Sequence, residues 1–264
     1  MKHIQLIGMP TDRNSSFLKG TSKAPAKIRE VLASDMMNLF SENGLELGSD
    51  ISFEDRGDLL LTEQDEQTLI ETSISDVLVT GHIPLVLGGD HSITYPIIKA
   101  IASHHGPINI LHIDAHPDLY HDYQGNRFSH ASPFARIMEE GLARRLVQVG
   151  IRTLNRHQRQ QAEHFGVEII TMRNLELLKT LQFDSPLYIS IDLDGLDPAH
   201  APGVSHHEPG GLSVRQLLEI LFSIDPPVLG ADIVEYNPDR DIQDMTAAVA
   251  AKLVKELAAL ASTR

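Results

Sequence analysis

The sequence predicts a three-layer α/β/α fold with a central, mostly parallel sheet. Short runs rich in Val, Ile and Leu alternate along the chain with segments whose apolar residues recur at helical spacing. Alternating strands and helices favour parallel strands joined by helical crossovers, and continuous apolar runs are typical of strands covered on both faces. A closed eight-stranded barrel shows the same alternation and stays as the alternative architecture.

The apolar runs and the helical patterns together predict the elements of one domain over residues 1–264. The predicted strands are 4–7, 83–87, 108–113, 146–149, 167–170, 187–193 and 228–234. The predicted helices are 25–34, 62–80, 93–104, 133–141, 155–165, 213–223 and 246–260. Pro25 stands at an early helical position, and Ser213 precedes its helix as an N-cap. The Ala- and Leu-rich helix 246–260 suits either packing on the sheet or an oligomer interface.

Composition narrows the function. The 264 residues are 42% hydrophobic, which suffices for a core, and the net charge of −14 argues against general binding to nucleic acid or to an anionic membrane. There is no cysteine, so thiolate metal sites and cysteine nucleophiles are excluded. No stretch approaches the roughly 20 apolar residues of a membrane span, and the N-terminus lacks a signal-peptide pattern, so we expect a cytoplasmic protein.

Acidic and histidine residues follow the ends of three predicted strands. The three segments are GGDHS at 88–92, DAHPD at 114–118 and SIDLDGLDP at 190–198. Ligands of open α/β sheets bind at the carboxyl ends of strands, so these side chains are expected to share one site. If the strand continues past Asp192, its period of two places Asp194 on the same side.

Carboxylates gathered at an apolar sheet repel one another unless a cation holds them. Divalent metals remove this conflict. Four carboxylates and two imidazoles suffice for two M²⁺ ions, namely Asp114, Asp118, Asp192, Asp194, His91 and His116. Such oxygen-rich ligation suits Mn²⁺, although Fe, Co, Ni or Zn also accept it. A metal pair lowers the pKa of a shared water, which is the equipment of a hydrolase.

These motifs, with EPGGLS at 208–213 and VEYNP at 234–238, resemble the ureohydrolase family of arginases, agmatinases and related guanidino hydrolases. The resemblance spans nearly the whole chain, and its middle stretch, from Gly125 to Arg152, is similar to the plant arginase branch. It implies a sheet of about eight strands, two Mn²⁺ per subunit, a small cationic guanidino substrate, and a homo-oligomer that is a trimer or a hexamer.

The resemblance also implies roles for individual residues. Glu235 matches the acid that pairs with the substrate guanidinium, and His130 matches a histidine that shuttles a proton. Asp118 or Asp194 would relay that proton, and Asn126 matches a residue near the substrate carboxylate. L-Arginine is the expected substrate. Agmatine or a guanidino acid is the alternative, because Thr153 stands where animal-type arginases have an acidic residue.

Other polar residues of these segments have simpler explanations. We expect His112 to be a buried core histidine, and Asp197 to form a turn. Asp90 and Asp232 are expected to support the ligands from behind. An arginine set is expected to form a solvated face with salt bridges, namely Arg136, Arg144, Arg145 and Arg152. A mononuclear zinc amidohydrolase of the deacetylase type is the competing enzyme class.

Overall fold

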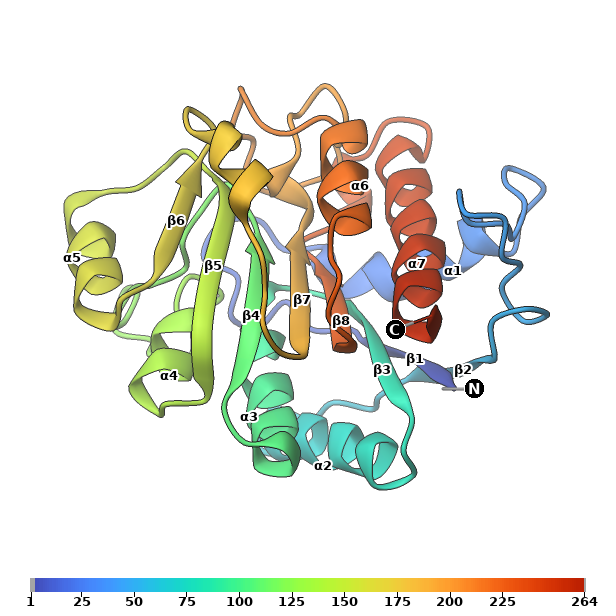
Figure 1. The fold of residues 1–264 in the computed structure, drawn as a ribbon, viewed down its shortest axis with the longest axis horizontal. Helices are drawn as coiled ribbons and strands as arrows, with labels where there is room; N and C mark the ends of the chain where they lie inside the picture. The colour runs from blue at the N-terminus through green and yellow to red at the C-terminus, as the bar shows by residue number, and fades with distance from the viewer. Residues whose placement is uncertain (1–2, 264) are drawn as a thin grey trace.

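Residues 3–263 are described by a computed structural model in which eight parallel strands form one open sheet (Figure 1). The order across the sheet is β2-β1-β3-β8-β7-β4-β5-β6. The strands are β1 (Ile4–Met9), β2 (Phe53–Asp58), β3 (Ile83–Gly88), β4 (Ile108–Ile113), β5 (Ala143–Ile151), β6 (Glu168–Thr171), β7 (Leu187–Asp192) and β8 (Val228–Val234). Because β2 and β6 are free edges, the sheet is not a closed barrel.

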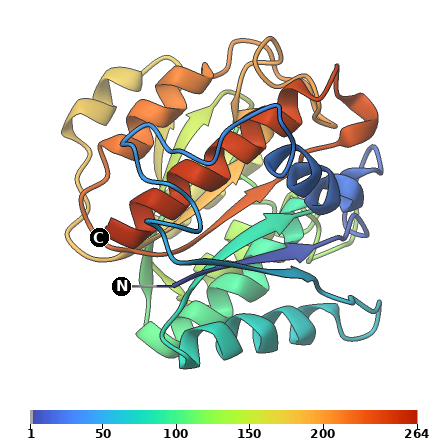
Figure 2. The same ribbon diagram turned by 90° about the vertical axis from the view of Figure 1, so that its right-hand side faces the viewer.

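Helices cover both faces of the sheet, as the three-layer prediction requires (Figure 2). One layer contains α1 (Ala24–Leu32), α6 (Val214–Phe222) and α7 (Met245–Thr263). The other contains α2 (Glu66–Val79), α3 (Thr94–His105), α4 (Pro133–Glu139) and α5 (Arg156–Phe165). Each layer packs on its own core of buried aliphatic side chains. The short 3-10 helices are η1 (Thr21–Lys23), η2 (His91–Ile93), η3 (Leu175–Thr180), η4 (Leu193–Gly195) and η5 (Pro238–Arg240).

All the predicted strands are present. The structure has one further strand, β2, that was not predicted. The interior strands β3, β4 and β7 are buried along their whole length, which is why their sequences read as continuous apolar runs. Strand β2 has the sequence FEDRGD and is largely exposed at the edge. An edge strand needs no apolar run, so the sequence signal that identified the others was absent.

Two local expectations about helices are settled by the structure. Ser213 is the N-cap of α6, and its side chain and that of Gln216 form a reciprocal capping box. Helix α7 packs against α1 and the sheet, with most of its residues buried, so it serves the fold of the chain itself. None of the helices in residues 3–263 combines the length and the apolar character that a bilayer crossing requires.

The path of the chain through the sheet creates the site. After β3 the chain skips two positions, because β4 lies beyond β8 and β7 in the strand order. The later strands β7 and β8 then fill the gap between β3 and β4. The carboxyl ends of β3, β8, β7 and β4 therefore lie side by side, and this is where open α/β sheets bind ligands.

Candidate metal centre

A buried imidazole and three carboxylates meet at the end of β3. Nδ1 of His91 lies 3.1 Å from Oδ2 of Asp118, 3.2 Å from Oδ2 of Asp192 and 3.4 Å from Oδ2 of Asp114. All four residues are buried, and they come from the ends of β3, β4 and β7. One cation could be bound by these four side chains together.

A second group shares Asp114 with the first. Nδ1 of His116 lies 3.1 Å from Oδ2 of Asp194 and 3.4 Å from Oδ1 of Asp114. His116, Asp114 and Asp194 are close enough together to hold one cation. The structure thus brings the six predicted ligands into two groups with one carboxylate in common.

The backbone of the candidate site is unusual at Asp118 and at Gly195. Asp118 has a φ of 49°, in the left-handed region that non-glycine residues seldom occupy. A Cβ on Gly195 would lie 2.9 Å from the backbone nitrogen of Asp114, so only glycine lets the loop after β7 approach so closely. Strained and crowded backbone of this kind is common where side chains are held for a function.

The expected extension of the strand past Asp192 is wrong. Strand β7 ends at Asp192, and Asp194 lies in the 3-10 turn η4. Oδ1 of Asp192 accepts a hydrogen bond of 2.8 Å from the backbone N–H of Asp194. Both carboxylates still reach the site, because the turn redirects Asp194 toward His116 instead of continuing the period of two.

Crowding of like charges shifts the ionisation of these groups. Burial, together with the charges of Asp194 and Asp114, raises the pKa of Asp192 well above its ordinary value. Burial also raises the pKa of Asp194 to about 6, although His116 opposes the shift. Burial lowers the pKa of His116, but the carboxylates of Asp194 and Asp114 outweigh it and raise the pKa. The cluster therefore carries the repulsion that bound cations would remove.

The donor atoms fit divalent metal ions. Nδ1 of His91 is buried and has no well-formed hydrogen bond among the described residues, although three carboxylate oxygens converge on it. Buried polar atoms normally have partners, so this nitrogen has the position of a ligand atom. Carboxylate oxygen with some imidazole is a donor set that Mn²⁺ accepts.

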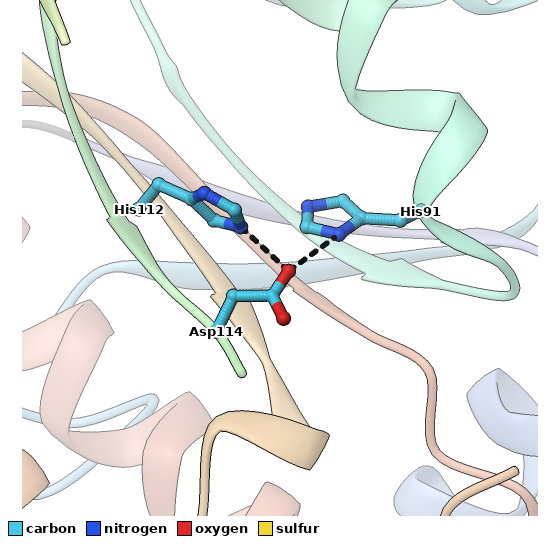
Figure 3. A group of neighbouring side chains, drawn as sticks. All are labelled: His91, His112 and Asp114. Atoms are coloured by element: carbon cyan, nitrogen blue, oxygen red, sulfur yellow. Dashed lines mark hydrogen bonds and ion pairs between the residues drawn. The ribbon is translucent and has the colours of Figure 1, made fainter. Parts of the chain in front are cut away.

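His112 is a buried core histidine, as predicted, and it contacts the same carboxylate. Figure 3 shows His91 and His112 directed at one oxygen of Asp114, with Nε2 of His112 at 2.8 Å. The His112 ring stacks on Phe134, and its Nδ1 lies 3.0 Å from the amide nitrogen of Gln148. Burial lowers the pKa of His112, so this ring is held neutral behind Asp114.

Glu235 and His130 form a pair above the carboxylates. Nδ1 of His130 lies 2.9 Å from Oε1 of Glu235, which also accepts the backbone N–H of His91 at 3.0 Å. Oε2 of Glu235 accepts no hydrogen bond from the described residues. On the other side of the His130 ring, Nε2 lies 2.8 Å from the hydroxyl of Ser16. Glu235 has a φ of 63°, so its backbone is strained like that of Asp118.

These groups border a cavity of about 200 Å³. The lining residues are Ser16, His116, Asp118, Tyr120, Tyr123, His130, Ala131, Thr153, Gln158, Asp192, Asp194, His206, Glu208 and Glu235. None of them is Lys or Arg, whereas five are acidic. The cavity therefore suits a small cation.

Comparison with known proteins identifies the family. The sequence profile of the Arginase family matches residues 2–259. The chain belongs to the arginase family. It is 50% identical to arginase 1, mitochondrial, of Arabidopsis thaliana, over 96% of this chain and 80% of the relative. It is 34% identical to agmatinase of Bacillus anthracis, over 96% of this chain and 90% of the relative.

Solved structures of the arginase family share the fold. The arginase from Medicago truncatula superposes with a TM-score of 0.93 and 45% identity, covering 98% of this chain and 87% of that one. The agmatine ureohydrolase of Thermoplasma volcanium gives a TM-score of 0.87 at 28% identity, covering 98% and 90%. Both the arginase and the agmatinase branches therefore resemble this chain in fold.

The expected solvated face is wrong for two arginines of this arginase-family protein, although Arg136 forms one of the expected salt bridges, with Glu139. Arg136 is 2% exposed and donates to the carbonyl oxygens of His121 and Arg127. Arg152 is half-buried and donates to the carbonyl oxygens of Asp194 and of Glu208. Both bind backbone carbonyl oxygens, and neither position carries an apolar pattern that could have indicated burial.

Asp232 and Asp90 hold the candidate ligand His91 in place through hydrogen bonds, as predicted. Nε2 of His91 lies 2.9 Å from the hydroxyl of Ser190, which donates at 2.7 Å to Asp232. Oδ1 of Asp90 accepts the backbone N–H of Ser92 and caps the turn η2 that carries His91. The role of Ser190 was missed, although its place in the motif SIDLDGLDP offered a signal.

Asn126 does not lie among the residues that line the cavity. Its Nδ2 donates to Oδ1 of Asn14 at 3.0 Å, and its own Oδ1 accepts the N–H of Phe128. The side chain thus joins the loop around residue 126 to the loop around residue 14. A substrate contact by Asn126 stays a prediction.

Proposed function

We propose that this protein hydrolyses the guanidino group of L-arginine to urea and L-ornithine at a pair of Mn²⁺ ions. The observation that carries this proposal is the pair of ligand groups sharing Asp114 beneath the carboxylate of Glu235. His91 and His116 lie in different groups, which favours two ions over the single ion of the deacetylase class. His112 forms a further group with His91 and Asp114. The arginases among the relatives support arginine as the substrate.

In this proposal the first ion is held by His91, Asp114, Asp118 and Asp192. The second would be held by Asp114, His116 and Asp194. When bound, such a pair supplies positive charge and a water of lowered pKa. The four aspartates contribute four negative charges, which balance two divalent ions.

Glu235 binds and orients the substrate. Its Oε2 accepts an N–H group of the guanidinium, because hydrogen bonds between two charged groups are the strong ones. The hydrogen bonds from His130 and from the backbone of His91 hold Oε1 and so fix the plane of the carboxylate. The carbon of the guanidino group then lies over the aspartate cluster.

His130 moves the proton that the leaving amine requires. Water adds to the guanidino carbon, the C–N bond to the substrate chain breaks, and the departing nitrogen gains a proton. Nε2 of His130 accepts the backbone N–H of Ser16 at 3.1 Å and lies 2.8 Å from its hydroxyl at the cavity wall. When that N–H contact is released, the protonated ring can give a proton to the departing nitrogen. Asp118 or Asp194 takes up the proton that the water loses.

Agmatine is the second candidate substrate. It is arginine without the carboxylate, and none of the lining residues is a Lys or Arg that would bind a carboxylate.

We also predict a trimer or hexamer and a cytoplasmic location, although relatives are named mitochondrial.

The test is urea release from arginine, agmatine and 4-guanidinobutyrate by the protein loaded with Mn²⁺. We expect urea from arginine, with two metal ions per chain by elemental analysis. Release of urea from none of the three substrates contradicts the proposal. One zinc ion per chain and no stimulation by Mn²⁺ would favour the deacetylase class instead.

A further inference from the structure

We propose that Glu208 binds a cationic amine at the end of the substrate that is remote from its guanidino group. The residue therefore selects guanidino substrates that carry a second positive charge. This inference rests on the proposed function, and it assigns the outer end of the same cavity.

Glu208 lies at the rim of the cavity, outside the aspartate cluster. Its Oε1 is 3.8 Å from Nε2 of His116, whose Nδ1 faces Asp194 at 3.1 Å. The His116 ring thus separates Glu208 from the aspartates. The Glu208 side chain is 38% exposed, and it lines the same cavity as Glu235. A substrate with its guanidinium on Glu235 extends toward this rim.

The loop that carries Glu208 is anchored to the segment 194–197, which follows β7. Nε and Nη2 of Arg152 donate to the carbonyl oxygen of Glu208 at 2.9 and 2.6 Å, and Nη2 also donates to that of Asp194 at 2.7 Å. Asp197 accepts the N–H groups of Gly210 and Gly211 at 2.7 and 3.1 Å. Glu208 is therefore held in position, and a fixed carboxylate discriminates between ligands better than a mobile one.

Among the acids of the cavity, Glu208 is the one whose cationic partner is most distant. Asp118, Asp192 and Asp194 each lie within 3.2 Å of a histidine nitrogen, and Glu235 lies 2.9 Å from His130. Within residues 3–263, the Glu208 carboxylate has one approach to a cationic group, the 3.8 Å to Nε2 of His116. The rim therefore offers a carboxylate with room for a cation.

A substrate that ends in a carboxylate meets the opposite situation. It would face Glu208 across the rim, and the residues that line the cavity include no Lys or Arg. Arg240 lies with Glu208 at a neighbouring hollow, and Arg152 is bound to backbone carbonyl oxygens. Like charges at short distance repel. A carboxylate that gives up water on binding, and finds no hydrogen-bond donor in its place, is destabilised. The site therefore favours an ammonium end over a carboxylate end.

Agmatine and 4-guanidinobutyrate provide a matched test, because they differ at the remote end, ammonium against carboxylate. We would measure kcat/KM for both with the Mn²⁺-loaded wild type and with Glu208→Gln, Glu208→Lys and Glu219→Gln. The control residue Glu219 is exposed on α6 and does not line the cavity. The ratio of the two kcat/KM values is internal to each protein, so the fraction of active molecules cancels.

We expect the wild type to prefer agmatine, and Glu208→Gln to lower the agmatine-to-guanidinobutyrate ratio about tenfold, mainly through KM. Glu208→Lys should lower the ratio further, and Glu219→Gln should leave it unchanged. Urea release with the wild-type ratio in Glu208→Gln would overturn the role of Glu208 alone. Arginine is assayed beside the two test substrates. Urea from arginine but from neither test substrate would overturn the selection of an ammonium end, and no urea from any of the three would overturn the proposed function.

Discussion

His130 and Glu235 lie 105 positions apart in the chain, yet Nδ1 of the one is 2.9 Å from Oε1 of the other. Burial alone would lower the pKa of His130, but the Glu235 carboxylate outweighs it and raises that pKa to about 9. The same pairing lowers the pKa of Glu235 against the effect of burial. Each residue thus stabilises the charged form of the other.

Replacing Glu235 with Gln should weaken catalysis and leave the metals bound. Gln keeps the shape but loses the negative charge that binds the guanidinium, a loss of about 1.5–3 kcal/mol, or roughly 10- to 100-fold in kcat/KM. Steady-state urea release and elemental analysis measure the two effects. Glu219→Gln is the control for the loss of one carboxylate elsewhere. Loss of metal in Glu235→Gln would contradict the separation of the two roles.

The titration of His130 should change in the same variant. Its ring pKa should fall from about 9 toward the ordinary value, because neutral Gln no longer favours the protonated ring. A folded-state pKa above the ordinary value gives stability that is complete below about pH 6.5 and is lost as pH rises through about 9. NMR titration of the ring checks the shift, and an unchanged pKa in Glu235→Gln would contradict the pairing.

Asp192→Asn should reduce both bound metal and turnover. The substitution replaces a charged ligand, whose Oδ2 lies 3.2 Å from Nδ1 of His91, with a neutral one. We expect less than two metal ions per chain and a turnover lowered by about 100-fold. Asp184→Asn is the matched control, since Asp184 is exposed before the opposite end of β7. Wild-type stoichiometry and rate in Asp192→Asn would refute the assignment.

Arg152→Met should destabilise the fold. Arg152 donates to the carbonyl oxygens of Asp194, Gly195, Leu196 and Glu208, and Met would remove this donor from all four, although Gly195 keeps the N–H of Leu212. We expect the free energy of unfolding to fall by about 3 kcal/mol, measured by urea denaturation. Arg144→Met, which breaks an exposed ion pair with Asp184, should cost about 0–1 kcal/mol. Equal effects of the two substitutions would contradict the anchoring role.

Removal of divalent cations should lower the melting temperature. Without them the buried carboxylates of Asp114, Asp118, Asp192 and Asp194 repel one another, and ligands that bind the native state stabilise it. We expect a chelator to lower the Tm by at least several degrees and added Mn²⁺ to restore it. Asp192→Asn should respond less. A Tm that is insensitive to the chelator in the wild type would contradict binding of cations at this site.

Much of the fold was predictable from the sequence because interior strands are covered on both faces. Apolar runs such as that of β7 follow directly from this burial, and helices such as α6 have their own capping signals. The six candidate ligands were predictable because carboxyl ends of parallel strands meet at one edge of the sheet. Local sequence patterns carry both kinds of information.

Tertiary structure alone decided how distant segments meet. The strand order, the polar edge strand β2 and the burial of Arg136 and Arg152 depend on contacts that no local pattern records. The rim position of Glu208 is of the same kind, since Arg152 and Asp197 place it. Local sequence specifies which side chains are available and how each segment is built. Distances between segments depend on packing of the whole sheet and its helices, which is a property of the folded chain.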